Sequence, residues 1–444
     1  MRWYRRSRLR HLPRASESQL TAQRPGIGRY RWVICALLFA ATSINYVDRQ
    51  IIGVLKPTLQ LEFGWTESSY GDVVFWFQAA YALGYLGFGR VIDKIGARLG
   101  YAAVVALWTA AHIAHALVSS LGGFIAVRFA LGLGESGNFP AGLKAIAEWF
   151  PKQERALATG IFVAGSNVGA IVTPLIVPFI TYRWGWRAAV VLTGSFSLVW
   201  LVFWLKIYRR PKDHPKLGAG ELAFINGDSS PEADAPRALT NMTWRRLLLV
   251  PETWAYALAR FLIDPIWWMF LFWLPDFFAK RYQLDLAYFG PPLVAVYLVS
   301  DLGSISGGWL SSRLIRSGFT LNRARKLTML LASILVMPVM FAMHADNLWL
   351  AVAILGMATA GHQAFSATLY TFPSDVFPKQ AVGTVVGIGG TAGAIGGMLM
   401  AKYAGWVLDG IGSYTPIFIV AAAVYILALG VLQVLAPRLR AVVM

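Results

Sequence analysis

Long stretches without a single Lys, Arg, Asp or Glu dominate this chain of 444 residues, and three examples are 99–127, 156–182 and 410–437. Most of these stretches approach or exceed the roughly 20 residues that cross a bilayer as a helix. Together with four less clean apolar segments, they predict an all-α membrane protein with twelve transmembrane helices. The expected spans are 31–56, 69–91, 98–119, 123–148, 155–181, 186–208, 252–277, 287–312, 325–345, 347–372, 381–408 and 413–437.

The composition excludes several other classes of protein. Only 14% of the residues are charged and 57% are hydrophobic, whereas about a quarter of the residues in a soluble globular chain are charged. The chain therefore lacks the polar surface of a soluble enzyme and the charge content of a disordered protein. Its single cysteine, Cys35, excludes an intrachain disulfide and a zinc site built from cysteines.

The net charge of +18 comes largely from the connections between the expected helices. Nine Arg precede or begin the first helix. The connections between helices 2 and 3, 6 and 7, and 8 and 9 are also basic, whereas the alternate connections are poor in Lys and Arg. By the positive-inside rule, this asymmetry predicts that both termini are cytoplasmic. It also explains the basic charge without nucleic acid, so we expect no such partner. The Arg-rich start resembles a transit peptide too, but a cytoplasmic tail fits the other connections better.

An internal repeat divides the chain. The tetrapeptide Phe-Pro-Lys-Gln occurs at 150–153 and again at 377–380, 227 positions later. Parallel duplication of a six-helix unit is typical of a large group of secondary transporters. The expected organisation is a basic cytoplasmic N-terminal tail 1–30, a six-helix half 31–208, a cytoplasmic linker 209–250, a second six-helix half 251–437 and a cytoplasmic C-terminus 438–444.

The connection after the second expected helix reads Gly-Arg-Val-Ile-Asp-Lys-Ile-Gly-Ala-Arg, at 89–98. Glycines permit a tight turn, and a carboxylate in a basic loop can pair with Arg or with a helix N-terminus. A related pattern after the eighth helix favours a specific role over an ordinary charged loop. We therefore expect Gly89, Asp93, Lys94 and Arg98 to act in gating, and this segment resembles the loop motif of the major facilitator superfamily.

Ionisable residues occur inside several expected spans, where an unpaired charge is costly and so indicates function. The first span contains Asp48 and Arg49, and the fourth contains Arg128 and Glu135, seven positions apart and so on one helix face. An Arg in a low-dielectric cavity suits a carboxylate, and acids in the same cavity can carry protons. The alternative is that these charges merely neutralise one another.

The same regions carry a family resemblance. Asn-Tyr-Val-Asp-Arg at 45–49 and Gly-Glu-Ser-Gly-Asn-Phe-Pro-Ala-Gly at 134–142 resemble the anion:cation symporter family of the major facilitator superfamily. Phe-Leu-Ile-Asp-Pro-Ile-Trp-Trp at 261–268 and Gly-His-Gln-Ala-Phe-Ser-Ala at 361–367 are similar to its hexuronate transporters. Aldonate and glucarate carriers share much of this pattern.

The resemblance implies roles for the matched residues. Arg49 would hold the substrate carboxylate, while Asp48 and Glu135 would carry protons. Arg128 would pair with Glu135. The other substrate-binding candidates are polar or aromatic, namely Tyr46, Gln78, Tyr81, Ser166, Asn167, Trp267, Gln363 and Ser366. Asp264 and Asp301 are weaker candidates within the membrane.

We expect a secondary active transporter, and not an enzyme, that imports an anionic sugar acid such as glucuronate or galacturonate by proton symport. Alternating access between the two halves would be driven by the proton gradient, without a cofactor or metal. Phe365 and Thr368 depart from the expected hexuronate pattern, so an aldonate, glucarate or an aromatic acid stays an alternative. The titratable Asp48 and Glu135 disfavour phosphate-ester exchange, and the repeated halves disfavour a channel or a membrane enzyme. We expect a monomer in the bacterial inner membrane, with a small organic anion, protons and the lipid bilayer as partners.

Overall fold

The structure, a computed structural model, describes residues 28–226, 244–439 and 442. Most of the predicted N-terminal tail (1–27), the middle of the predicted linker (227–243) and residues 440–441 and 443–444 lie outside the described residues. The first half is defined here as 28–226 and the second half as 244–439. The elements found in both halves are α-helices and short 3-10 helices.

The first half consists of long helices joined by short connections. They are α1 (Tyr30–Phe63), α2 (Glu67–Ile95), α3 (Ala97–Ala114), η2 (His115–Leu117), α4 (Leu121–Glu135), α5 (Asn138–Trp149) and α6 (Lys152–Ile207), followed by η3 (Pro211–Asp213) and α7 (Ala219–Asn226). α6 comprises two of the expected spans. Gly185, with φ 82° and ψ 163°, interrupts the helix between them. This positive φ favours glycine, which has no Cβ.

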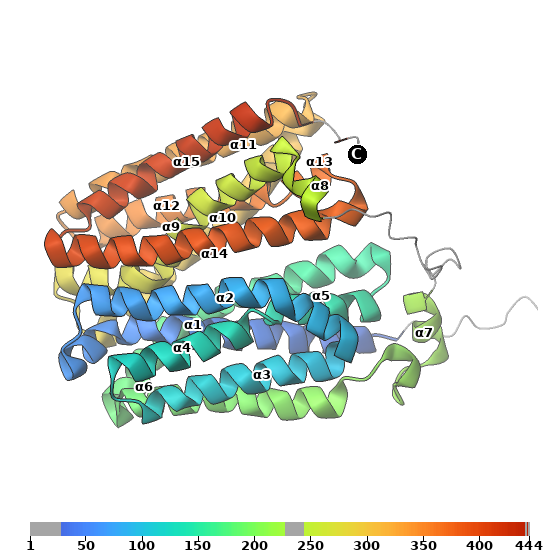
Figure 1. Cartoon of the computed structure of the whole chain (residues 1–444), viewed down its shortest axis with the longest axis horizontal. Helices are drawn as coiled ribbons and strands as arrows, with labels where there is room; N and C mark the ends of the chain where they lie inside the picture. Colours follow the sequence, from blue (N-terminus) through green and yellow to red (C-terminus); the bar gives the residue numbers. More distant parts are fainter. Residues whose placement is uncertain (1–27, 227–243, 440–441, 443–444) are drawn as a thin grey trace, which may run out of the picture.

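The second half repeats this arrangement. Its elements are α8 (Trp244–Leu248), α9 (Pro251–Tyr282), η5 (Leu286–Tyr288), α10 (Gly290–Arg316), α11 (Leu321–Val336), η6 (Met337–His344), α12 (Leu348–Leu369), α13 (Phe372–Val376), α14 (Lys379–Gly410) and α15 (Thr415–Leu435). Figure 1 shows α1 to α6 as one layered bundle and α9 to α15 as another, with their long axes running in the same general direction. α1 begins and α15 ends at the same end of the molecule, here named the terminal end, and the other is named the opposite end.

Nine helical segments of the described residues are long and apolar enough to cross a membrane, fewer than the twelve predicted. The difference has three physical sources. The segment Leu157–Ile207 counts once although Gly185 divides it. α2 is less apolar, because its charge-free run 73–89 contains Gln78 together with Trp, Tyr and Gly residues of low hydropathy. α4 is only 15 residues long.

Two differences from the expected spans matter for the site. α1 continues past residue 56 to Phe63 and includes Pro57, so Lys56 lies inside the helix and not at its end. The predicted single helix 123–148 is divided into α4 and α5 by a turn at Ser136 and Gly137. In this turn the Ser136 hydroxyl donates to the Leu133 carbonyl over 2.6 Å, and Gly137 N–H donates to the Gly134 carbonyl. Local hydrogen bonds of this kind compete with the regular helix ladder.

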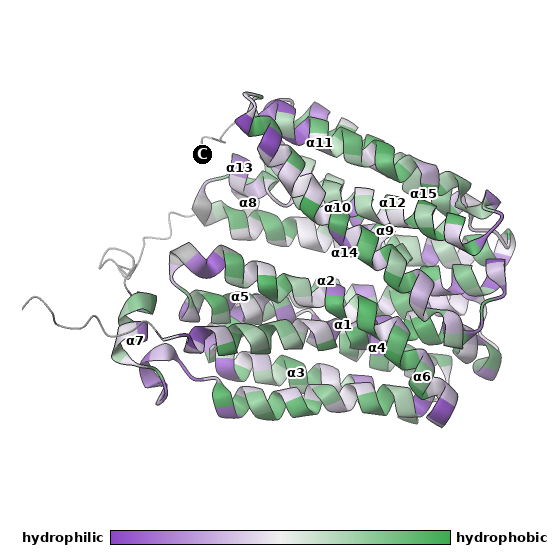
Figure 2. Ribbon diagram, turned by 180° about the vertical axis from the view of Figure 1, so that it is seen from behind, coloured by the Kyte–Doolittle hydropathy of each residue, from purple (hydrophilic) through white to green (hydrophobic). Residues whose placement is uncertain are grey.

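The outer surface of the bundles is apolar over the length of the helices. Phe196, Phe203 and Ile305 are 52%, 52% and 70% exposed, although side chains of this kind are buried in a water-soluble protein. Figure 2 shows hydrophobic residues along the helices and hydrophilic residues gathered near their ends. This distribution matches a bilayer solvent around the middle of the molecule and water at its two ends.

Small residues allow the helices of each bundle to approach closely, as is common in membranes. A Cβ atom added at Gly132 of α4 would lie 2.3 Å from the carbonyl oxygen of Phe77 in α2. One added at Gly134 would lie 2.7 Å from the backbone nitrogen of Trp108 in α3. The backbone of α4 thus packs directly on α2 and α3, which fixes the position of Glu135 at its end.

We predict that Gly132→Ala destabilises the protein, because the Phe77 backbone cannot yield without separating α2 from α4. Overpacking of this kind typically costs about 1–3 kcal/mol, and the thermal unfolding temperature in detergent should fall. Gly122→Ala is the matched control on the same helix, since nothing lies within 4 Å of its added Cβ. Equal unfolding temperatures for the two variants would contradict close packing at Gly132.

Candidate substrate and coupling site

The guanidinium of Arg49, on α1, is the centre of a buried polar cluster in the first half. Its Nε donates to Glu135 Oε2 on α4 over 2.8 Å. Its Nη2 donates to Asn45 Oδ1 over 3.0 Å and to the Tyr81 hydroxyl on α2 over 3.1 Å. Arg49 is 2% exposed and Glu135 is 0% exposed. This is an ion pair deep inside the protein, and it joins three helices.

Aromatic rings surround the same guanidinium. The Arg49 Cζ lies 4.6 Å from the ring centroid of Tyr46, 4.9 Å from that of Tyr81 and 5.1 Å from that of Trp268. A cation near the face of an aromatic ring is attracted by the ring quadrupole. Trp268 belongs to α9, so this cluster includes a side chain from the second half.

Trp267, a predicted substrate-binding residue, and its neighbour Trp268 have different surroundings. Trp268 lies beside Arg49, whereas the Trp267 ring stacks on His362 at a centroid distance of 5.3 Å. Consecutive residues of a helix point in directions about 100° apart, so only one of two neighbouring Trp residues can face Arg49. Sequence alone does not select between them.

The expected ion pair between Arg128 and Glu135 is not formed among the described residues. Glu135 pairs with Arg49 instead, and both Nη atoms of Arg128 donate to the backbone carbonyl of Arg49 over 3.3 Å. The Arg128 Cζ also lies 5.4 Å from the ring centroid of Phe77. Arg128 therefore supports the backbone of α1 at the position that carries Arg49.

Asp48 is buried on a different side of α1 from Arg49. Its Oδ2 accepts from the Ser197 hydroxyl on α6 over 3.0 Å, and its Oδ1 lies 3.3 Å from His112 Nε2 on α3. Among the described residues, Asp48 and Arg49 therefore do not pair with each other, contrary to the alternative in which they simply neutralise one another. His112 was not predicted as a site residue, because a histidine counted as neutral at pH 7 does not interrupt a charge-free stretch. A histidine in the charge-free stretch 99–127 was the available signal.

Several buried polar atoms in this region have no hydrogen-bond partner within the protein. They include both amide atoms of Gln78, Glu135 Oε1 and Asn45 Nδ2. Such groups are rare in native proteins, and each one calls for an explanation. Gln78 also faces the second half, since a Cβ added at Gly397 of α14 would lie 2.9 Å from its Nε2. The amide of Gln78 can both donate to and accept from a ligand hydroxyl.

The other predicted residues lie on α6, α12 and the remaining helices. The Ser166 hydroxyl donates to the Val163 carbonyl over 2.7 Å, and Asn167 follows it as a half-buried side chain. α6 packs closely on α1 here, since a Cβ added at Gly169, three positions after Ser166, would lie 2.6 Å from Tyr46 Cβ. The described contacts do not connect the α12 pair, half-buried Gln363 and buried Ser366, to Arg49.

The two weaker candidates differ in their surroundings. Asp264 pairs with Arg260 on the same helix, with 2.5 Å between Arg260 Nη2 and Asp264 Oδ2. A Cβ added at Gly393 would lie 2.0 Å from Asp264 Oδ2, so α14 leaves room for this carboxylate. Asp301 is half-buried on α10 and forms no ion pair with another described residue.

The predicted gating segment lies at the terminal end, between α2 and α3. Gly96 ends α2 with φ 85°, and its N–H donates to the Ile92 carbonyl over 2.9 Å. Arg98 donates from Nη2 to the Leu205 carbonyl over 2.6 Å and so links α3 to the end of α6. Gly89 and Lys94 belong to the last turns of α2, and the side chain of Asp93 lies outside the described residues.

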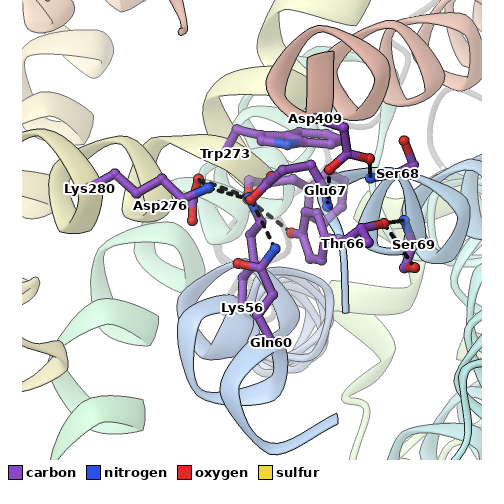
Figure 3. Close-up of polar contacts among 12 residues, drawn as sticks. Lys56, Gln60, Thr66, Glu67, Ser68, Ser69, Trp273, Asp276, Lys280 and Asp409 are labelled. Carbon is purple, nitrogen blue, oxygen red and sulfur yellow. Dashed lines mark hydrogen bonds and ion pairs between the residues drawn. The ribbon is translucent and has the colours of Figure 1, made fainter. Parts of the chain in front are cut away.

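A charged cluster that the sequence analysis missed joins the two halves at the opposite end (Figure 3). Lys56 of α1 is fully buried, with its Nζ 2.5 Å from Glu67 Oε2 and 2.8 Å from Asp276 Oδ2 of α9. Lys280 pairs with both acids, at 3.2 Å from Asp276 Oδ2. These four residues are named the closing cluster. Two cations and two acids alternate in it, so each charge has an opposite neighbour.

Further contacts extend the closing cluster toward α14. Both Oδ atoms of Asp409 accept backbone N–H groups at the start of α2, those of Glu67 and Ser68, each over 2.8 Å. Lys402 of α14 also pairs with Asp72 of α2. Carboxylates at a helix N-terminus are stabilised by the unpaired N–H groups and the helix dipole. The described contacts therefore hold the halves together at the opposite end.

Comparison with known proteins identifies the family. Residues 38–401 match the Major Facilitator Superfamily. The chain belongs to the Major Facilitator Superfamily. It is therefore a multi-pass membrane protein, in agreement with its apolar helices.

Two relatives and one solved structure narrow the comparison. The hexuronate transporter of Escherichia coli (strain K12) is 33% identical over 394 residues, 88% of this chain and 90% of that protein. The galacturonate transporter of Dickeya chrysanthemi is 34% identical over 308 residues, 69% of this chain and 89% of that protein. The resemblance to hexuronate transporters is thus confirmed.

The fold also matches the crystal structure of a bacterial homolog of the human lysosomal transporter Spinster, with a TM-score of 0.68. That structure is 17% identical in sequence, and the match covers 93% of this chain and 96% of that one. The predicted major facilitator fold is therefore confirmed.

We predict that Asp276→Asn opens the opposite end, because Lys56 and Lys280 lose a buried carboxylate. Removing one partner of a buried charge pair costs about 2–5 kcal/mol, and here that cost falls on the closed state. Spin labels at exposed Leu61 and Ile411, one in each half, would report a longer distance population, after replacement of Cys35.

Glu62→Gln provides the matched control. Glu62 pairs with Arg187 over 2.8 Å within the first half, and both side chains are exposed. The distance distribution should stay as in the wild type. A distribution unchanged by Asp276→Asn would contradict the assignment of the closing cluster.

Proposed function

We propose that this protein is a secondary active transporter that imports an anionic sugar acid by proton symport, with substrate binding at Arg49. The observation that carries the proposal is the buried Arg49–Glu135 ion pair, enclosed by Tyr46, Tyr81 and Trp268. The names of the relatives, hexuronate and galacturonate transporters, support this substrate class. These relatives are named as transporters, and we propose that this protein is not an enzyme.

Glu135 and a substrate carboxylate would compete for the same guanidinium. Arg49 can form two parallel hydrogen bonds with one carboxylate, but Glu135 already accepts from its Nε. Two carboxylates at one site repel each other, which favours protonation of one of them. Proton uptake by Glu135 would therefore release Arg49 for the substrate, and this competition couples the two ligands.

The neutral groups around Arg49 suit the rest of a sugar acid. Gln78 has two unpartnered amide atoms, and the Tyr81 hydroxyl is also beside the guanidinium. Hydroxyl groups of a sugar acid require several donors and acceptors of this kind. The half-buried Trp268 ring offers an apolar face for the C–H groups of the sugar. Gln363 and Ser366 are proposed as second-half contacts for the hydroxyls.

Alternating access would bring the site to each side of the membrane in turn. The closing cluster seals the opposite end in this structure, and the two halves would move about the Arg49 region. The segment with Gly89, Asp93, Lys94 and Arg98 would act in gating at the terminal end. Positive-inside loops support cytoplasmic termini and a bacterial inner-membrane location, and we propose a monomer.

We predict that an inward acid gradient drives accumulation of glucuronate or galacturonate in proteoliposomes without sodium. Symport moves protons and substrate in the same direction, so uptake should rise as the external pH falls below the internal pH. The panel should include galactonate and glucarate, because an aldonate or aldarate is the alternative substrate. Uptake that requires sodium and ignores a collapsed pH gradient would refute proton coupling.

We predict that Arg49→Lys reduces substrate affinity at least about 30-fold, since truncation of one partner in a buried, hydrogen-bonded charge pair costs about 2–5 kcal/mol. Lys keeps the charge but cannot form the paired hydrogen bonds of a guanidinium. Arg128→Gln should retain more affinity at low pH, because Arg128 bonds the backbone carbonyl of Arg49 and not its guanidinium. The variant also removes a cation near Glu135, which favours the protonated form of that acid. Calorimetry at two pH values separates the two variants.

One outcome of this calorimetric comparison would reverse the assignment of the anion site. If Arg49→Lys binds like the wild type while Arg128→Gln abolishes binding at both pH values, Arg128 and not Arg49 is the anion site.

A further inference from the structure

A second buried polar cluster lies on the far side of α1 from the Arg49 guanidinium. It consists of Asp48 on α1, His112 on α3, His115 in η2, and Thr193 and Ser197 on α6, and it is named the Asp48–histidine cluster. All five residues are buried, with exposed fractions from 0% to 4%. Neither histidine has a role in the function proposed above, and an ionisable group inside a membrane span is functional by default.

Hydrogen bonding determines which nitrogen of His112 carries its proton. The Thr193 hydroxyl lies 2.9 and 3.1 Å from the carbonyls of Ala189 and Val190 and can donate its one hydrogen there, which leaves its oxygen as an acceptor for His112. We therefore assign the proton of neutral His112 to Nε2, 2.9 Å from that oxygen. The same Nε2 lies 3.3 Å from Asp48 Oδ1. His112 Nδ1 is left buried and without a partner.

The second histidine has the reverse arrangement. His115 Nδ1 lies 2.9 Å from the Ala111 carbonyl and 3.1 Å from the His112 carbonyl. Carbonyl oxygens only accept, so His115 Nδ1 carries the proton and Nε2 is the unpartnered nitrogen. The two imidazole centroids are 6.0 Å apart. Each ring thus keeps one free basic nitrogen, and the two rings are neighbours.

We propose that Asp48 and His112 together bind a coupling proton, and that His115 relays this proton to and from the opposite end. This inference rests on the proposed proton symport and adds a proton-binding pair to it. His115 is two positions before Leu117, which is 85% exposed at the end of η2. The proposed proton path would use these histidines and not the residues that contact the Arg49 guanidinium.

The proton balance of the pair is simple. A proton from water adds to His115 Nε2 and passes to His112 Nδ1, which leaves His115 neutral again. His112 then carries protons on both nitrogens, and its positive charge lies next to the Asp48 carboxylate, with 3.3 Å between Nε2 and Oδ1. The pair gains one proton and one positive charge, and loss of the proton from Nδ1 restores the starting state. Because the two groups interact closely, the proton belongs to the pair.

Charged groups on α4 connect this cluster with the Arg49 site. Arg128 and Glu135 both act electrostatically on Asp48, and the Arg128 cation also acts on His112 and His115, where it opposes a further positive charge. The neighbours contributed by α6, Thr193 and Ser197, are neutral. Arg128 also donates to the Arg49 carbonyl. Protonation of the pair therefore changes the field at the same Arg128 and Glu135 that adjoin the substrate site.

The test uses the full-length carrier in proteoliposomes, as wild type, His112→Gln and His115→Gln. Two transport modes are compared: exchange of labelled for unlabelled substrate without a pH gradient, and accumulation driven by an inward acid gradient over a range of external pH. Gln at position 112 can still donate to Thr193 but cannot bind a proton. His214→Gln is the matched control, since His214 is a buried histidine of the first half that is hydrogen-bonded to the Ile207 carbonyl over 3.0 Å.

We expect His112→Gln to retain exchange but to lose accumulation by about tenfold or more, the size of a typical coupling between two sites. Its pH dependence should also be flatter than that of the wild type. A relay affects rate and not equilibrium, so His115→Gln should approach the wild-type plateau more slowly. His214→Gln should match the wild type in both modes.

Wild-type accumulation and an unchanged pH profile in His112→Gln would overturn the proposal. If the wild type itself does not accumulate substrate in a pH gradient, proton symport fails first, and that result is distinct. If His112→Gln does not fold, Thr193→Val takes its place, because it removes the acceptor of Nε2. We then expect the pH midpoint to shift by about one unit, and an unshifted midpoint overturns the assignment.

Discussion

The ion pair between Arg49 and Glu135 is the interaction on which the centre of this protein depends. A guanidinium in a membrane interior needs a counter-charge, and removal of one partner from such a buried pair costs about 3–5 kcal/mol. Here Glu135, Asn45 and Tyr81 supply hydrogen bonds, and aromatic rings from both halves enclose the cation. A movement that separates Arg49 from Glu135 must therefore bring another anion to Arg49 or a proton to Glu135. This requirement links binding, protonation and motion in one place.

α1 distributes charge along the whole molecule. At the terminal end Arg31 pairs with Glu154 of α6 and Glu221 of α7. In the middle Asp48 and Arg49 point into different clusters, and at the opposite end Lys56 joins the closing cluster. A shift of this single helix would disturb all three levels together. This arrangement gives a physical route by which protonation near the centre can influence contacts at the ends.

Close backbone packing makes such a route effective. Gly397 of α14 leaves space for Gln78 of α2 and for Trp268 of α9, while Gly132 of α4 rests on the backbone of Phe77. Packed interiors yield by discrete steps and not by continuous deformation. The two halves therefore meet through small residues near the proposed site and through charges at the opposite end, where partners can exchange.

The sequence by itself determined the helical membrane fold and the duplicated halves and identified Arg49, Asp48 and Glu135 as site candidates, because charge-free stretches, repeats and intramembrane charges are local properties of the chain. It also offered Gln78 and Tyr81 as substrate-binding candidates. The tertiary structure decided which charges pair, since Glu135 meets Arg49 and not Arg128, and which of two neighbouring Trp residues faces the cation. It alone brought Lys56 to Asp276, 220 positions away, and Asp48 to His112. Side-chain direction and long-range pairing depend on how the helices rotate and pack, and no local pattern encodes that.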